Sequence, residues 1–138
     1  MFQYEYTVKG KMDIGKVWAL YSDVSQWPKW QPDMVKVELE GDFAAGTKGT
    51  EFMKEMPPMP FTLEEVERNK MFVDSSTFDD VTVKIGHFIS DGGNGEHSLR
   101  HTVTITGPDE AQVQELGENI VADIPDSMAK LFELAKIG

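Results

Sequence analysis

An apolar stripe along residues 108–137 predicts a long helix at the end of the chain. Pro108 and Asp109 are typical of a helix start, because proline fits the first turn and acids suit its positive end. Gly117 and Pro125 interrupt the pattern, so we expect a bend or break before residue 126. Apolar residues recur at spacings of three or four along one face: Val113, Leu116, Ile120, Ile124, Met128, Leu131 and Ala135.

Alternating apolar and polar residues predict strands before this helix. The expected strands are residues 2–9, 35–39, 48–55, 61–68, 71–78, 81–89 and 96–106. Two short helices lie between the first and second strands; Asp13 caps one, Ser25 can cap the other, and Pro28 and Pro32 end helical structure around Trp30. Consecutive strands joined by short turns favour an antiparallel sheet, whose concave face then receives the C-terminal stripe.

Composition narrows the classes of partner. The chain has 138 residues, enough for one domain with a core, and we expect residues 1–138 to form that single domain. Its net charge of −11 makes nucleic acid and anionic membrane surfaces poor partners. There is no cysteine and no apolar run as long as a membrane span, so we expect a cytoplasmic protein that does not insert into membranes. We expect no cofactor, and a monomer or a homodimer.

Two histidines are the main candidates for chemistry. His87 and His101 fall on the apolar faces of the last two strands, which places both imidazoles in the interior. If they pair directly, their Cβ atoms lie roughly 5 Å apart. A two-residue turn at Asn94-Gly95 pairs His87 with Thr102 instead. We follow the apolar alternation, since a three-residue loop or a bulge would restore the direct pairing.

Three interpretations of this pair stay open. The histidines can form a proton-transfer pair, supply two nitrogen ligands to a metal, or stand at a cavity wall where water or backbone satisfies them. Two ligands without a clear third are too few for a metal site, so we expect none. Glu64 or Glu65 can add a carboxylate, depending on which face of its strand is inside; the alternative is that both are solvated.

Local motifs in this order resemble those of the helix-grip fold of the SRPBCC superfamily, the START-like and birch-pollen-allergen-like domains. Residues 17–24 with Trp27 and Trp30 resemble its first helix and "D…W..W" segment. Residues 46–50 resemble its third-strand entry. Gly107-Pro108 and residues 124–131 resemble the terminal helix of the polyketide cyclase/dehydrase and lipid-transport branch.

The resemblance implies an α+β protein in which a seven-stranded curved antiparallel sheet wraps around the long helix and encloses a cavity. Its members bind hydrophobic small molecules, and a minority catalyse cyclisation or dehydration. We therefore expect a binder of a small hydrophobic or aromatic molecule. One alternative is a cyclase or dehydratase acting on a polyketide-like or aromatic substrate with His87 or His101 as general base. The other is a protein-interaction module with a closed interior.

The expected cavity wall combines aromatic, methionine and aliphatic side chains. The aromatic residues near the first two helices can equally build core, and the loop at residues 56–60 can either rim the cavity or simply pack on the helix. The residues expected at the wall are Trp18, Tyr21, Trp27, Trp30, Met56, Met59, Phe72, Ile85, Val103, Gly117, Ile120, Ile124 and Met128.

Overall fold

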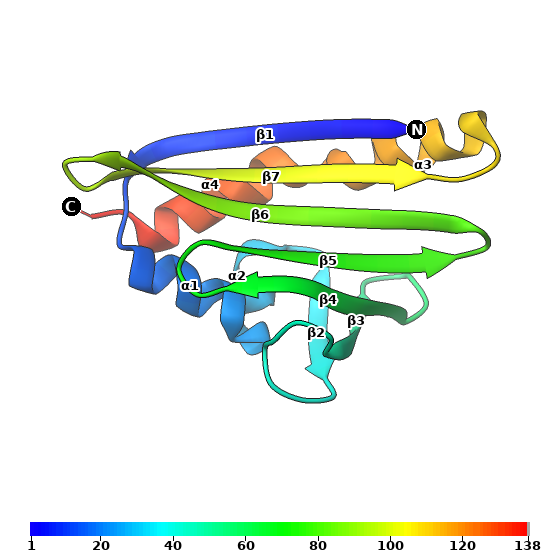
Figure 1. Ribbon diagram of the computed structural model, residues 1–138, viewed down its shortest axis with the longest axis horizontal. Coiled ribbons are helices and arrows are strands. Elements are labelled where there is room, and N and C mark those ends of the chain that lie inside the picture. Colours follow the sequence, from blue (N-terminus) through cyan, green and yellow to red (C-terminus); the bar gives the residue numbers. More distant parts are fainter. Residues whose placement is uncertain (138) are drawn as a thin grey trace.

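The structure is a computed structural model that describes residues 1–137. Seven antiparallel strands form one sheet in the order β1-β7-β6-β5-β4-β3-β2 (Figure 1). The strands are β1 (Phe2–Lys11), β2 (Met34–Leu39), β3 (Lys48–Met53), β4 (Met59–Glu67), β5 (Met71–Phe78), β6 (Val81–Gly93) and β7 (Glu96–Thr106). The helical elements are α1 (Ile14–Ser22), the 3-10 turn η1 (Val24–Gln26), α2 (Trp27–Trp30), α3 (Glu110–Val121) and α4 (Ile124–Ala135).

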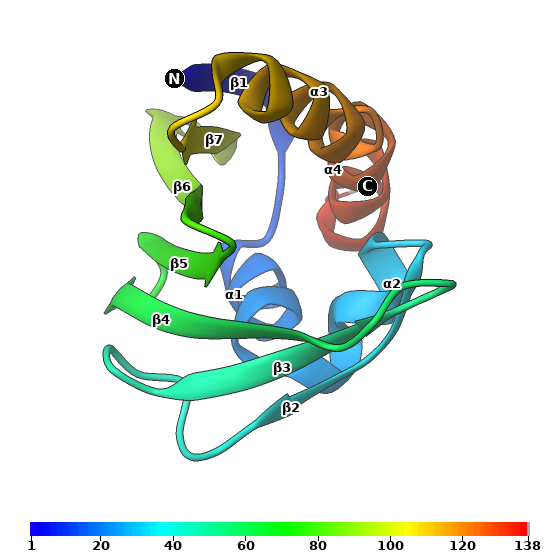
Figure 2. The same cartoon turned by 90° about the vertical axis from the view of Figure 1, so that its right-hand side faces the viewer.

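The sheet curls around the helices. Seen end-on, the strands curve from β1 to β2, while α3 and α4 lie across the open side and α1 and α2 lie inside the curve (Figure 2). α2 contacts both β2 and α4, so the short helices join the far edge of the sheet to the C-terminal helices. This arrangement is the helix-grip fold, and the expected fold class is confirmed.

The β6–β7 hairpin satisfies both signals that conflicted in the sequence. Asn94 and Gly95 form a two-residue turn with φ of 56° and 78°, which pairs Gly93 with Glu96. Gly92 is then left over as a bulge, and the register shifts by one residue. Beyond the bulge, His87 stands directly opposite His101, as the apolar alternation required.

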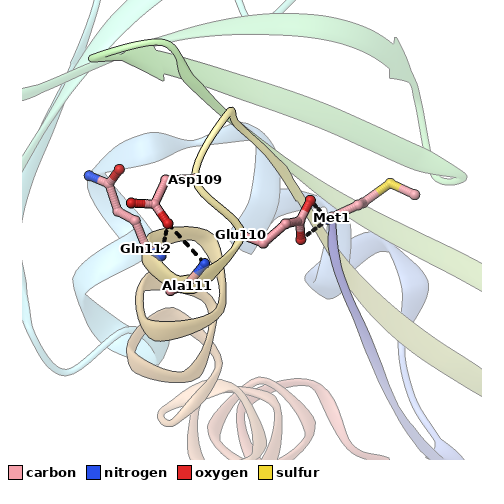
Figure 3. A network of polar contacts seen from close by, with 5 residues as sticks. All are labelled: Met1, Asp109, Glu110, Ala111 and Gln112. Carbon is pink, nitrogen blue, oxygen red and sulfur yellow. Dashed lines mark hydrogen bonds and ion pairs between the residues drawn. The ribbon is translucent and has the colours of Figure 1, made fainter.

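The C-terminal stripe is confirmed as two helices with a break between them. Asp109 is the N-cap of α3, and its carboxylate accepts hydrogen bonds from the backbone amides of Ala111 and Gln112 (Figure 3). Figure 3 also shows the amino group of Met1 paired with Glu110, which joins α3 to the start of β1. The break falls at residues 122–123, before Pro125 in the first turn of α4.

Gly117 does not interrupt the helix, contrary to expectation. It lies within α3, and a Cβ atom placed there would be 2.4 Å from the ring of Phe2. The glycine therefore lets β1 pack closely against α3. Leu116 and Ile120, its neighbours on the stripe, are half-buried against the sheet.

Two expectations for the short helices need correction. Asp23, and not Ser25, caps η1 by accepting a hydrogen bond from the Ser25 amide. Pro28 stands in the first turn of α2, where its missing amide costs nothing, so it starts this helix and does not end one. The indole nitrogens then fasten the segment, because Trp27 donates to the Tyr21 carbonyl and Trp30 to the Leu20 carbonyl.

β4 also differs from the expected strand. It begins at Met59, so Pro60 belongs to the strand; it pairs with Thr50 of β3 and lies beyond the β4–β5 ladder, which starts at residue 62. Glu64 forms a bulge, and both Glu64 and Glu65 are exposed to solvent. The solvated alternative is therefore correct for these two acids.

Within residues 1–137, no helix is both long and apolar enough to cross a bilayer.

Candidate functional site

A cavity of about 510 Å³ lies between the sheet and the C-terminal helices. Strands β3 to β7 supply one wall, α2 another, and α3 and α4 the third. Both histidines reach this cavity. Of the other residues expected at its wall, the following line it: Trp27, Trp30, Met56, Met59, Ile85, Ile120 and Ile124.

The remaining expected wall residues lie in the packed core or behind the wall: Trp18, Tyr21, Phe72, Val103, Gly117 and Met128. Aromatic packing explains the largest of these. The Tyr21 ring lies edge-on to Phe72, with ring centroids 5.1 Å apart, and Trp18 lies edge-on to Tyr21 at 6.4 Å. This aromatic cluster fills one end of the fold, so the cavity occupies only the rest of the interior.

The histidine pair sits between this cluster and the cavity. The ring centroids of His87 and His101 are 4.6 Å apart, with the planes at 72°. His101 Nε2 shares a hydrogen bond of 2.8 Å with the Tyr21 hydroxyl. His87 Nδ1 lies 3.2 Å from the Phe72 carbonyl, which can only accept, so Nδ1 carries the proton. His87 Nε2 therefore keeps a lone pair and has no hydrogen-bond partner within residues 1–137.

Both imidazoles are neutral at physiological pH. Burial lowers the pKa of His87 to about 3, even though the Phe72 carbonyl favours the protonated ring. Burial also holds the pKa of His101 well below its usual range, and the neighbouring His87 lowers it further. The pair consequently offers hydrogen-bond acceptors and donors without adding positive charge to the cavity.

Two carboxyl groups accompany the histidines. Asp74, in the middle of β5, is only 5% exposed and stands between Leu63 of β4 and Ile85 of β6. Glu51 of β3 also lines the cavity. Burial, then the nearby Glu51, hold the pKa of Asp74 well above its usual range, and burial raises the pKa of Glu51 to about 7.

The sequence contained a signal for Asp74 and none for Glu51. Asp74 alternates with Phe72 and shares its face with Leu63, so following the apolar residues, and not the acids of β4, leads to it. In β3 both faces carry polar residues, because Lys48 and Thr50 alternate with Gly49 and Glu51. No periodicity in that strand identifies the inner face.

The cavity meets solvent between α2, the β3–β4 loop and the α3–α4 break. Asp33 and Asp123 line it there and are exposed. Partial burial raises the pKa of Asp123, and a hydrogen bond to Asp33 raises it further. Met56 also lines the cavity at this opening although it is 54% exposed, so the 56–60 loop rims the cavity.

No protein-family model and no curated protein matches this chain. Solved structures do match. The di-domain ARO/CYC BexL from the BE-7585A biosynthetic pathway aligns with a TM-score of 0.78 at 12% identity, covering 97% of this chain and 46% of that one, so this chain spans about half of BexL. A truncated norcoclaurine synthase from Thalictrum flavum aligns with a TM-score of 0.73 at 13% identity, covering 96% and 92%.

The protein XoxI from Bacillus cereus aligns with a TM-score of 0.78 at 16% identity, covering 96% of this chain and 94% of XoxI. At such identities these likenesses show the fold alone. The resemblance to the SRPBCC superfamily is thereby confirmed at the level of the fold: this chain has the helix-grip fold, like its structural neighbours.

Proposed function

We propose that this helix-grip chain forms one domain that binds a small hydrophobic or aromatic molecule in the cavity between its sheet and α3–α4. One observation carries the proposal: the interior is hollow. Its volume of about 510 Å³ falls inside the range of roughly 300–1,000 Å³ that is usual for small-molecule sites. A core packed to ordinary density leaves few voids larger than a water molecule.

The wall suits such a ligand. Ile85, Ile120 and Ile124 offer apolar surface, and each square ångström of apolar ligand area removed from water contributes about 25 cal/mol. His87 Nε2 and the Asp74 carboxyl then offer a few fixed hydrogen bonds that set the ligand's orientation. The alternative of a closed interaction module is disfavoured, because it requires the side chains to fill this volume.

An acid–base enzyme is the second candidate, and Glu51 favours it. A general acid or base works best when its pKa lies near the working pH. The raised pKa of Glu51, about 7, meets this condition, whereas the pKa of His87, about 3, makes that imidazole a weak base. If the cavity catalyses a cyclisation or dehydration, the proton is therefore transferred by Glu51, with His87 and His101 orienting the substrate. A synthase is among the similar structures.

A cavity-filling variant tests the binding function. Ile120→Trp places a large ring in the cavity from α3, and Glu115→Trp places the same ring on the exposed side of that helix. With N-phenyl-1-naphthylamine as the fluorescent probe, we expect saturable one-to-one binding by the wild type and by Glu115→Trp. Ile120→Trp should bind at least tenfold more weakly while keeping its far-ultraviolet circular dichroism. Equal binding by the folded Ile120→Trp, or none by the wild type, contradicts the proposal.

A further inference from the structure

We propose that the ligand of this cavity is an organic cation, a hydrophobic amine whose protonated nitrogen pairs with the carboxyl groups of Asp74 and Glu51. The inference rests on the proposed function, because it names the ligand class of the same cavity. It begins from two acids of the cavity wall, Asp74 and Glu51, that form no ion pair within residues 1–137.

Asp74 is the central observation. Its side chain is 5% exposed and lines the cavity, yet within residues 1–137 it makes no hydrogen bond or ion pair. No fully buried side-chain oxygen or nitrogen of the described residues lacks a hydrogen-bond partner, so the Asp74 carboxyl oxygens are open to the cavity. Its neighbours Leu63 and Ile85 show that an apolar residue fits this row of the sheet. Buried groups of this kind are concentrated at functional sites. A molecule bound in the cavity can therefore pair directly with Asp74.

The charged residues around the cavity indicate that the ligand group that pairs with Asp74 carries a positive charge. Among residues 1–137, four acidic side chains line the cavity, those of Asp33, Glu51, Asp74 and Asp123, and one lysine, Lys54. Within residues 1–137, neither Glu51 nor Asp74 forms an ion pair with Lys54 or with any other base. A carboxylate ligand would raise the pKa of Asp74 and Glu51 still further and find no opposite charge there, because repulsion between like charges is weakly screened in a poorly solvated space. A cation would instead give Asp74 and Glu51 the partner that the chain does not supply.

Aromatic rings add to this preference. Trp27 and Trp30 both line the cavity. The ring centroid of Trp30 lies 6.4 Å from that of His87, which lines the cavity as well. An ammonium group over an indole face gains about 0.5–2 kcal/mol, more than over other aromatic rings. The same wall thus accepts both the apolar body of an amine and its charged end.

Binding of a cation predicts proton release. Asp74 and Glu51 have raised pKa values and retain protons near neutral pH, and a positive charge beside them lowers those values again. The amine should therefore bind more tightly as the pH rises from 6 to 8, while it stays protonated itself. The other titratable groups lining the cavity are Lys54, the exposed Asp33 and Asp123, and His87 and His101, whose lowered pKa values keep them neutral throughout.

Matched probes test the charge preference. One set is tryptamine, tryptophol and indole-3-acetate; the other is 2-(1-naphthyl)ethylamine, 2-(1-naphthyl)ethanol and 1-naphthylacetate. Each set holds the ring constant and changes the side-chain head from cation to neutral to anion. In calorimetric titrations at pH 7 we expect the amine to bind at least tenfold more tightly than the alcohol, and the carboxylate most weakly. Repeating the amine titration in buffers of different ionisation enthalpy should show net proton release.

Isosteric variants identify the groups responsible. Asp74→Asn and Glu51→Gln should each weaken amine binding at least tenfold and so remove the preference for the amine over the alcohol. Glu65→Gln, an exposed acid of β4, should change neither. If a variant fails to fold, the ranking of probes on the wild type decides alone. Equal affinity for amine and alcohol overturns this inference and leaves the proposed function standing, whereas no binding by any probe contradicts both.

Discussion

Replacing Glu51 with glutamine is expected to stabilise the protein at neutral pH and to leave its stability near pH 4 almost unchanged. Glutamine keeps the shape of the protonated acid and cannot ionise. In the wild type, burial raises the pKa of Glu51 from 4.5 to about 7. Between these two values the unfolded chain releases its proton while the folded protein retains it, so the wild type loses stability as the pH rises through this window. Above about pH 7 the loss is complete.

The size of the effect follows from the shift in pKa. A difference of about 2.5 pKa units at roughly 1.4 kcal/mol per unit gives a loss of about 3 kcal/mol between pH 4 and pH 7. With an unfolding entropy of about 2 cal/mol/K per residue, a chain of 138 residues shifts its melting temperature by about 10 °C for such a change. Removing Glu51 also removes one of the influences that raise the pKa of Asp74, so its carboxyl should ionise at lower pH in the variant.

The assay is urea unfolding of the wild type, Glu51→Gln and Glu65→Gln across pH 4 to pH 8. The gap between Glu51→Gln and the wild type should open as the pH rises, and Glu65→Gln should follow the wild type because that acid is solvated. If the unfolding free energies of Glu51→Gln and the wild type change in parallel from pH 4 to pH 8, then burial does not raise the pKa of Glu51. The argument from buried carboxyls would then be wrong.

Two further predictions concern packing and hydrogen bonding. Gly49→Ala should destabilise the protein by about 1–3 kcal/mol in urea unfolding, because its Cβ would lie 2.8 Å from the Glu38 carbonyl oxygen. The control is Gly41→Ala, which should be neutral because the nearest contact of its Cβ would be 3.8 Å. Equal effects of the two substitutions would refute the argument. Tyr21→Phe should lower stability by about 1–3 kcal/mol, because it leaves His101 Nε2 buried without its partner; unchanged unfolding would mean that this hydrogen bond contributes nothing.

The fold was predictable from the sequence because its signals are long and agree with one another. The apolar stripe from Val113 to Ala135 and the alternation in the last two strands are enough to predict a helix that packs against a sheet. Even the pairing of His87 with His101 followed from alternation, although the bulge at Gly92 that reconciles it with the turn could only be named as an option.

The site was harder to predict, for physical reasons. Which acid enters the interior depends on the twist and bulges of short strands, so Glu64 and Glu65 drew attention while Asp74 and Glu51 line the cavity. The boundary between core and cavity also depends on how aromatic rings interlock. Tyr21 was expected at the cavity wall, but it lies in the core behind His101 and forms a hydrogen bond with that imidazole.

The central claim is that the interior of this protein is open and takes a small molecule. Native mass spectrometry of the purified protein, compared with its denatured mass, tests it most directly. The account predicts a reproducible extra mass that is lost on denaturation, or a one-to-one adduct when the amine probes are added, and a much smaller bound fraction in Ile120→Trp. A wild-type protein that carries no extra mass and forms no adduct with any of the probes would contradict it.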